Sequence, residues 1–326
     1  MKIEDEAIMV TGGAGFIGSH LVDQLIDEMP RSIIVVDNLF LGREVNLVSA
    51  YSRIEDALIF YKQDASDFDA MKPLFEKHDV KAVFNLAVLP LPCSLEKPKF
   101  CSDVNMQIVS TLCELQRLGH FETLIQFSSS EAYGSARYKP MDEAHPLGPS
   151  TPYSASKAGG DLLALSYHRC FGTDVSVVRP FNNYGPRQNE GSYAGIIPIT
   201  IRRILTGASP ILYGDGMQTR DLVYVGETAR MAVEVCKQNG KTRGAALNVC
   251  SGQEVAMIDL VKLIMKYMNY KGEIVFQPER AGDVKRHVGN PFLAEDILGF
   301  HYDMPFEKGL KLTVDWYLDK FGSGNL

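Results

Sequence analysis

The sequence predicts an α/β fold, in which a Rossmann-like doubly wound parallel sheet is joined to a smaller C-terminal region. Three observations support this prediction. Short, continuous apolar runs alternate with stretches of helical periodicity as far as Arg179. A glycine-rich turn, from Gly12 to Gly18, follows the first of these runs. Beyond Arg179, prolines and glycines crowd the chain and the apolar runs become short and isolated.

Each predicted strand is a short apolar run, the pattern of a strand covered on both faces. In chain order the runs are 7–10, 33–36, 57–61, 82–86, 124–127 and 175–178, and helical spacing of apolar residues fills 16–28. After residue 179 we expect strands at 222–225 and 246–249, an amphipathic helix at 258–270 and a frayed tail at 321–326. We therefore place a Rossmann domain at 1–179 and a second region at 180–326, with some crossing of segments after 179.

The bulk composition is that of an ordinary globular protein. The 326 residues are 45% hydrophobic and 22% charged, and the net charge is −7, which does not favour nucleic acid or an anionic membrane as a partner. The six cysteines lack Cys-x-x-Cys spacing and the histidines lack His-x-x-x-His spacing, so we expect free thiols and no metal site. The N-terminus is acidic and no apolar run has membrane-spanning length, which predicts a cytoplasmic protein.

The glycine turn predicts a dinucleotide site. Gly12, Gly15 and Gly18 lie between a predicted strand and a predicted helix, where backbone amides can bind a pyrophosphate. Asp37 ends the next strand, 19 residues after Gly18, and its carboxylate would bind ribose hydroxyls and repel a 2′-phosphate. This favours NAD over NADP. Asp64 either faces the adenine or caps a helix. The full set of candidate cofactor residues is Gly12, Gly15, Phe16, Ile17, Gly18, Asp37, Asn38, Asp64, Ala65, Leu86, Ala87, Tyr153 and Lys157.

A candidate base lies further along the chain. Tyr153 and Lys157 are one helical turn apart, and Ser129 ends an apolar run upstream. A phenol has an ordinary pKa of about 10, and we expect the lysine to lower it by favouring the phenolate. The three side chains could remove a hydroxyl proton while a nicotinamide takes the hydride.

These motifs resemble the extended short-chain dehydrogenases that modify nucleotide sugars. The matching segments are 12–18, 85–87, 128–134, 153–157, 179–187, 218–221 and 279–283. The resemblance implies that Tyr153 is the base at the sugar 4-hydroxyl, that Lys157 binds the nicotinamide ribose and that Ser129 is the catalytic serine. It also implies that Asn182 and Arg220 meet the substrate diphosphate, with Arg280 as a second cation. Arg187 and Asp283, in the same motifs, complete the candidate substrate site.

The reaction type depends on Ser130 and Glu131. Ser130 occupies the aspartate position of many 4,6-dehydratases, whereas the neighbouring glutamate is kept as Glu131. A glutamate here can remove the C5 proton of a 4-keto sugar and protonate the leaving C6 hydroxyl, and both residues join the candidate catalytic set. The resemblance therefore favours a nucleotide-sugar 4,6-dehydratase. A UDP-sugar 4-epimerase and then a UDP-glucuronate decarboxylase remain alternatives, with Glu131 as a structural carboxylate.

Two further features bear on substrate and assembly. The segment 85–93 is apolar and contains two prolines where many family members have a polar or small loop, and it borders the expected sugar pocket. Helices near 105–118 and 153–170 carry more apolar residues than one buried face needs, including Ala155, Ala158, Leu162 and Leu165. Family members pair such helices into a four-helix bundle, which implies a homodimer.

Overall fold

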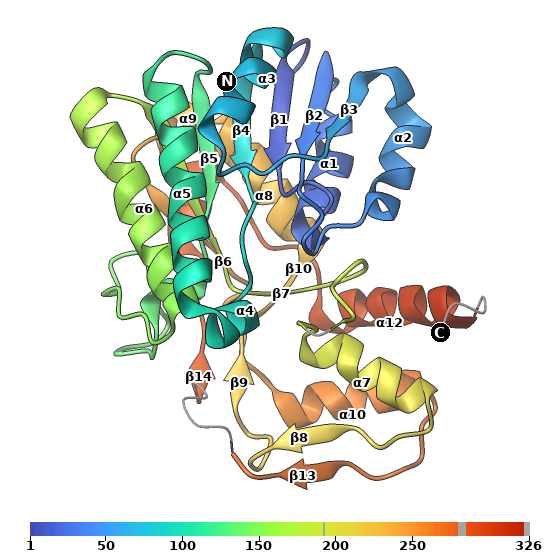
Figure 1. The fold of residues 1–326 in the computed structure, drawn as a ribbon. Helices are drawn as coiled ribbons and strands as arrows, with labels where there is room; N and C mark the ends of the chain where they lie inside the picture. The colour runs from blue at the N-terminus through green and yellow to red at the C-terminus, as the bar shows by residue number, and fades with distance from the viewer. Residues whose placement is uncertain (192, 280–284, 323–326) are drawn as a thin grey trace.

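A parallel seven-stranded sheet forms the centre of the molecule (Figure 1). The structure is a computed structural model and describes residues 1–191, 193–279 and 285–322. The strand order is β11-β6-β5-β4-β1-β2-β3. The bounds are β1 Ala7–Thr11, β2 Ser32–Val36, β3 Leu58–Tyr61, β4 Val80–Asn85, β5 Thr123–Phe127, β6 Asp174–Pro180 and β11 Ala246–Val249. The sequence prediction of a doubly wound parallel sheet is confirmed, and the first six strands end within two residues of their predicted limits.

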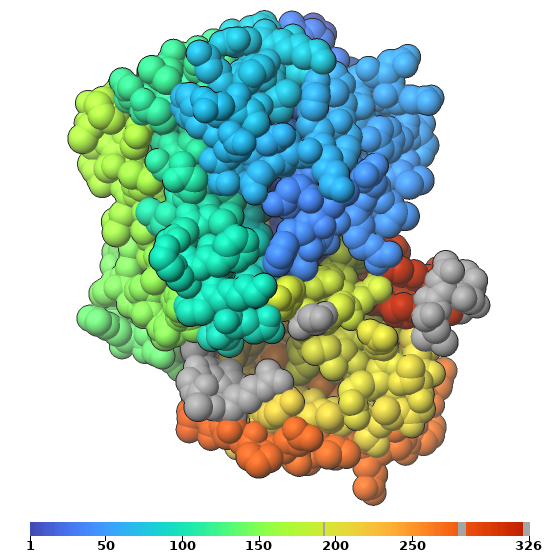
Figure 2. Space-filling view, in the orientation of Figure 1, coloured from blue at the N-terminus to red at the C-terminus, as the bar shows by residue number. Residues whose placement is uncertain are grey.

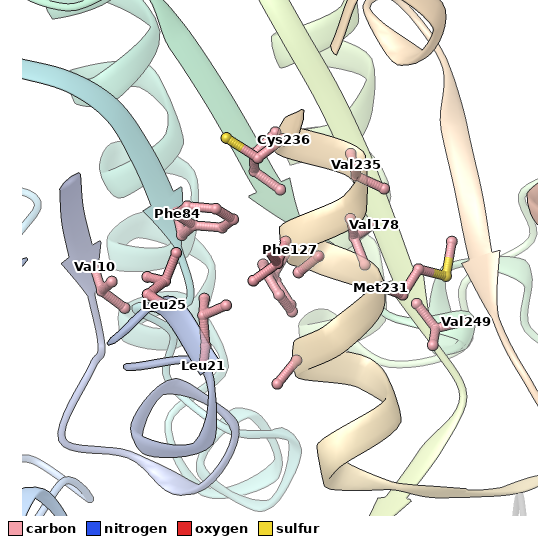
Figure 3. Close-up of a cluster of buried hydrophobic side chains, with 14 of the residues drawn as sticks. Val10, Leu21, Leu25, Phe84, Phe127, Val178, Met231, Val235, Cys236 and Val249 are labelled. Carbon is pink, nitrogen blue, oxygen red and sulfur yellow. The ribbon is translucent and has the colours of Figure 1, made fainter. Parts of the chain in front are cut away.

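Helices cover both faces of this sheet. The first face carries α1 (Phe16–Ile26) and α8 (Val225–Lys237), and the second carries α3 (Phe68–His78), α5 (Pro98–Arg117) and α6 (Pro152–Phe171). Successive residues of a strand point to opposite faces, so Val10 belongs to the first core and Met9 to the second. Figure 3 shows Leu21 and Leu25 of α1 lying near Val10 and Phe84, with Met231 and Val235 projecting from α8.

The strand predicted at 246–249 belongs to the main sheet rather than to the C-terminal region. Ala246 pairs with Val177 and Val249 pairs with Pro180, both in parallel register. β11 therefore covers the β6 edge of the sheet, whose backbone would otherwise expose unpaired groups. The chain crosses back into the N-terminal half before it returns to the smaller region.

The smaller region has a core of its own. It packs α7 (Ile196–Leu205), α10 (Met257–Tyr267) and α12 (Phe306–Gly322) around buried Ile201, Leu260 and Val314. Its short strands are β7 Asn182–Tyr184, β8 Ile211–Tyr213, β9 Thr219–Arg220, β10 Leu222–Tyr224, β12 Val255–Ala256, β13 Val275–Gln277 and β14 Arg286–His287. α12 continues into the predicted tail because Phe321 stacks on Tyr317; residues 323–326 lie outside the described residues.

The remaining helical segments are short connections. They are α2 Val48–Ile54, α4 Leu91–Glu96, α9 Asn239–Thr242, α11 Phe292–Leu298 and the single turns Glu44–Leu47, Glu55–Ala57 and Ser130–Tyr133. Figure 2 shows the N-terminal part in blue to green above the yellow and orange C-terminal region, with a recess at the boundary. Within the described part of the chain, every helix is too short or too polar to cross a bilayer.

Candidate active site

A cavity of about 480 Å³ lies between the two halves of the molecule. It is lined by segments that follow the carboxyl ends of β1, β2, β4, β5 and β6, which is where doubly wound sheets bind their ligands. All thirteen candidate cofactor residues line this one cavity: Gly12, Gly15, Phe16, Ile17, Gly18, Asp37, Asn38, Asp64, Ala65, Leu86, Ala87, Tyr153 and Lys157. Residues widely separated in the sequence therefore meet at a single site.

The glycine turn packs too closely for larger residues. A Cβ atom on Gly18 would lie 2.2 Å from the carbonyl oxygen of Gly12, and Gly12 has a φ of +70°. The turn leads directly into α1. Its N-cap residue, Gly15, has no side chain to cap the first backbone amides of the helix, so these amides can bind a ligand. Free amides and the positive end of the helix suit a pyrophosphate, so this cradle fits the dinucleotide that the sequence predicts.

Asp37 is held rigidly at the end of β2. Its two carboxylate oxygens accept hydrogen bonds from the amides of Ala14, at 3.0 Å, and Leu39, at 2.8 Å. Burial raises the pKa of Asp37, and the two amides oppose this shift. Asp64 also lines the cavity while one of its oxygens accepts hydrogen bonds from Ser66. The helix that follows, α3, is capped by Asp67 and not by Asp64, so the alternative that Asp64 caps a helix is wrong, and its place in the cavity leaves the adenine role as a prediction.

Tyr153 and Lys157 project from the first turns of α6. The start of this helix is fixed by a capping box in which Thr151 and Ser154 bind each other's backbone amides. Ser129 precedes the turn Ser130–Tyr133, and its hydroxyl accepts a hydrogen bond from the amide of Glu131 at 3.2 Å. Tyr153, Lys157, Ser129 and Glu131 all line the cavity.

The pKa of Tyr153 moves opposite to the expected direction. Burial raises it to about 12, a hydrogen bond with Ser129 lowers it, and the nearby charge of Glu131 raises it further. The net shift is therefore upward, because the desolvation of the phenolate outweighs the groups that favour it, and the lowering effect expected of Lys157 stays a prediction. Glu131 and Tyr153 line the same cavity.

Lys157 is a buried cation with one short hydrogen bond. Its ammonium donates to the carbonyl oxygen of Phe127 at 2.5 Å, and burial lowers its pKa to about 8. Asp161, one turn further along α6, opposes that shift and is itself fully buried. One Asp161 oxygen accepts hydrogen bonds from Ser128 at 2.6 Å and from Arg179 at 2.8 Å.

Asp161 was not among the residues predicted from the sequence for this site. The one signal for it was an acid four residues after Lys157 in an otherwise apolar helical stretch. Gln188, which lines the cavity directly after the matched segment 179–187, was also missed. Its side-chain oxygen is buried without a hydrogen-bond partner, as is the side-chain nitrogen of cavity-lining Asn182. These two amides offer one acceptor and one donor to a ligand.

The other predicted site residues lie apart from this cavity or beyond the described chain. Ser130 is buried and is not among the lining residues. Arg187 forms an ion pair with Asp23 of α1 at 2.7 Å and does not line the cavity. Arg220 lies on β9, in register with His287 of β14, and also stays outside the lining set. Arg280 and Asp283 lie outside the described residues.

Comparison with known proteins identifies the family. A family model described as GDP-mannose 4,6 dehydratase matches residues 9–313. The chain belongs to this family. The membership confirms the expected resemblance to extended short-chain dehydrogenases and shows that the protein is an enzyme. Within the described residues, His, Cys, Asp and Glu form no cluster that could hold a metal ion.

Relatives of two reaction classes match the chain over nearly its whole length. The chain is 34% identical to a putative UDP-glucose 4-epimerase of Methanocaldococcus jannaschii, over 95% of this chain and 97% of that one. It is 32% identical to a dTDP-glucose 4,6-dehydratase of an Actinoplanes species, again over 95% and 97%.

Solved structures show the same division. A UDP-glucose 4-epimerase from Thermotoga maritima with UDP-glucose superposes with a TM-score of 0.90 at 32% identity, over 97% and 99% of the two chains. A dTDP-glucose 4,6-dehydratase from Streptomyces venezuelae with NAD bound also has a TM-score of 0.90, at 30% identity, over 98% and 99%. The fold therefore does not distinguish the two reactions.

The buried ammonium of Lys157 should make stability depend on pH. Its pKa is about 8 in the folded protein and 10.5 ordinarily, so between these values the unfolded chain binds the additional proton. The free energy of unfolding should therefore rise with pH across this window, by at most about 3 kcal/mol from this group. Urea unfolding from pH 7 to 10.5 should show a shallower rise in Lys157→Met. Identical pH profiles for the two proteins would contradict the assignment.

Proposed function

We propose that this enzyme is an NAD-dependent nucleotide-sugar 4,6-dehydratase that acts through a 4-keto sugar. The observation that carries the proposal is the position of Glu131, whose carboxylate lines the same cavity as Tyr153 and Ser129 and acts electrostatically on the phenol. A 4,6-dehydratase needs a base at the 4-hydroxyl and a second acid–base group at C5 and C6. The cavity supplies both.

The chain's own residues would divide the work as follows. Tyr153 takes the proton of the 4-hydroxyl, with Ser129 hydrogen-bonded to it. NAD, when bound by the glycine turn, Asp37 and Lys157, would supply the acceptor for the C4 hydride and return it later, and its positive charge would favour the phenolate of Tyr153. Glu131 then removes the proton at C5 and gives a proton to the leaving C6 hydroxyl. Lys157 orients the nicotinamide ribose from its fixed position on Phe127.

The same proposal assigns the substrate to the boundary of the two halves. Asn182 and Gln188 carry unpartnered amide atoms on the side of the smaller region, which suits polar groups of a nucleotide sugar. We therefore propose residues 180–326 as the main source of substrate contacts. Arg220 and Arg280 remain candidates for the diphosphate, and Asp283 remains a candidate for another part of the substrate. Arg187 is a positioning candidate through its ion pair with Asp23.

Asp37 should decide the cofactor preference. NAD should bind more tightly than NADP, because a 2′-phosphate would place like charges beside the Asp37 carboxylate. Replacing Asp37 with Ala should reduce the preference at least tenfold, measured by calorimetric titration of both cofactors. Asp56→Ala, which removes an exposed carboxylate, should leave the ratio unchanged. A wild-type preference for NADP would refute this role of Asp37.

We also propose that the enzyme is a homodimer formed through α5 and α6. Ala155 and Leu162 are both exposed on α6 and lie seven residues apart, on one face of the helix, and Leu162 is 53% exposed. Leu165 is half-buried, whereas Ala158 already packs within the chain. Leu162→Glu should shift the sedimentation coefficient at micromolar concentration from dimer to monomer. Leu312→Glu, on an exposed position of α12, should not. Wild-type protein that sediments only as a monomer would contradict the proposal.

Glu131 tests the reaction type. In a dehydratase, Glu131→Gln should still oxidise C4, so that bound NAD accumulates as NADH with an absorbance at 340 nm. Loss of water should then fall by about a hundred- to ten-thousand-fold, as should exchange of the C5 hydrogen with deuterated solvent. Tyr153→Phe is the control, because it should block the first step and give no NADH.

Mass spectrometry of reactions with UDP-, dTDP- and GDP-sugars distinguishes the alternatives. Loss of water supports the dehydratase, and loss of carbon dioxide from UDP-glucuronate would indicate a decarboxylase. A product of unchanged mass, formed at the normal rate by Glu131→Gln, would establish the 4-epimerase that the M. jannaschii relative is named for.

A further inference from the structure

The segment after β4 forms a wall of the cavity that is made of hydrocarbon side chains. Val88, Leu89, Pro90 and Leu91 all line the cavity, together with Tyr153, Ser129 and Glu131. The four residues carry no side-chain donor or acceptor. This is the double-proline segment in which the sequence departs from its family.

The backbone of this wall is also largely engaged. The amide of Leu89 donates to the side-chain oxygen of Asn105 at 2.8 Å, and its carbonyl accepts from the Asn105 nitrogen at 3.2 Å. Pro90 has no amide hydrogen, and the carbonyl of Leu91 accepts a hydrogen bond from the Ser94 hydroxyl at 2.7 Å. Leu89 and Pro90 therefore present carbon, and no donor, to a ligand.

The wall is fixed relative to the proposed catalytic residues. The nitrogen of Asn105 that holds Leu89 also donates to the hydroxyl of Ser156 at 3.0 Å. Ser156 adjoins Lys157 on α6. Leu89 itself is buried against Cys93 and Cys101. The wall cannot swing away to admit water without breaking these contacts, so a sugar at Tyr153 meets it as a rigid apolar surface.

We propose, on the basis of the nucleotide-sugar assignment within the proposed function and independently of its reaction type, that the substrate is a nucleotide sugar that presents a methyl group to this wall. A hydroxyl that faces Leu89 and Pro90 would lose its hydrogen bonds to water without replacement, whereas a methyl group there gains burial. Two sugars share this chemistry: a 2-acetamido hexose and a 6-deoxy hexose. The two sugars imply different reactions. A 2-acetamido hexose can lose its C6 hydroxyl as water, whereas a 6-deoxy hexose has no C6 hydroxyl to eliminate and would require epimerisation.

Binding to an inactive variant tests the wall independently of turnover. Tyr153→Phe protein saturated with NAD is titrated calorimetrically with UDP, dTDP and GDP to find the accepted nucleotide. The glucose conjugate of that nucleotide is then compared with its N-acetylglucosamine and 6-deoxyglucose conjugates. One of the two methyl-bearing sugars should bind about 10- to 100-fold more tightly than the glucose conjugate, because a methyl group would then face the wall in place of a hydroxyl that finds no partner there. The conjugate that binds more tightly shows whether the methyl group belongs to an acetamido group or to C6 of a 6-deoxy sugar.

Substitutions in the wall provide the controls. Leu91→Gln should abolish the preference for the methyl-bearing sugar, Leu91→Met should retain it, and Leu312→Gln on the surface of α12 should leave it unchanged. Equal or tighter binding of the glucose conjugate to the parent protein would overturn the proposal, even with turnover intact. Failure of all three nucleoside diphosphates to bind would overturn the nucleotide-sugar assignment itself.

Discussion

The hydrogen bond from Lys157 to the carbonyl of Phe127 fixes the geometry of the whole site. It is the last of a series of buried hydrogen bonds. The series starts on β1, where the Thr11 hydroxyl donates to the side-chain oxygen of Asn85 at 2.7 Å. Asn85 donates to Gln126 at 2.7 Å, and Gln126 donates to the same Phe127 carbonyl at 3.0 Å. Three strands and α6 are therefore held in one register at the edge of the sheet where the glycine turn also ends. Movement of α6 would break contacts in each of them.

This arrangement places the charged ammonium of Lys157 in the protein interior. The surrounding residues reduce the free-energy cost of burying it. A buried ammonium is unfavourable unless paired or hydrogen-bonded. Asp161 provides the negative charge, Arg179 compensates Asp161, and Arg179 also donates to the Tyr133 hydroxyl at 3.0 Å. Asp161 opposes the effect of burial on Lys157, whose pKa is about 8. A lysine in this state can be a cation toward a ribose and still exchange a proton.

The fold could be predicted from the spacing of apolar residues in the sequence. Parts of the site could not, because they depend on the geometry of local turns and on contacts between distant segments. The buried strands and the glycine turn are short-range patterns, so their positions were predicted to within two residues. The direction of each side chain in 129–131 depends on one tight turn, which puts Ser129 and Glu131 on the cavity and Ser130 behind it. Arg187 has a φ of +65° and meets Asp23, a contact between segments that no local pattern encodes. The same holds for Asp161 and Arg179.

The return of β11 to the central sheet limits how this protein can be rearranged by recombination. α8 and β11 both complete the N-terminal half, although the segments before α8 and after β11 contribute to the core of the smaller region. A chimaera joined at a single point near residue 180 would take its last sheet strand and its substrate region from the same donor. The inherited strand would then have to match a foreign β6 edge. Exchange of substrate specificity between relatives is therefore easier through short internal loops, such as 88–91, than through a swap of whole halves.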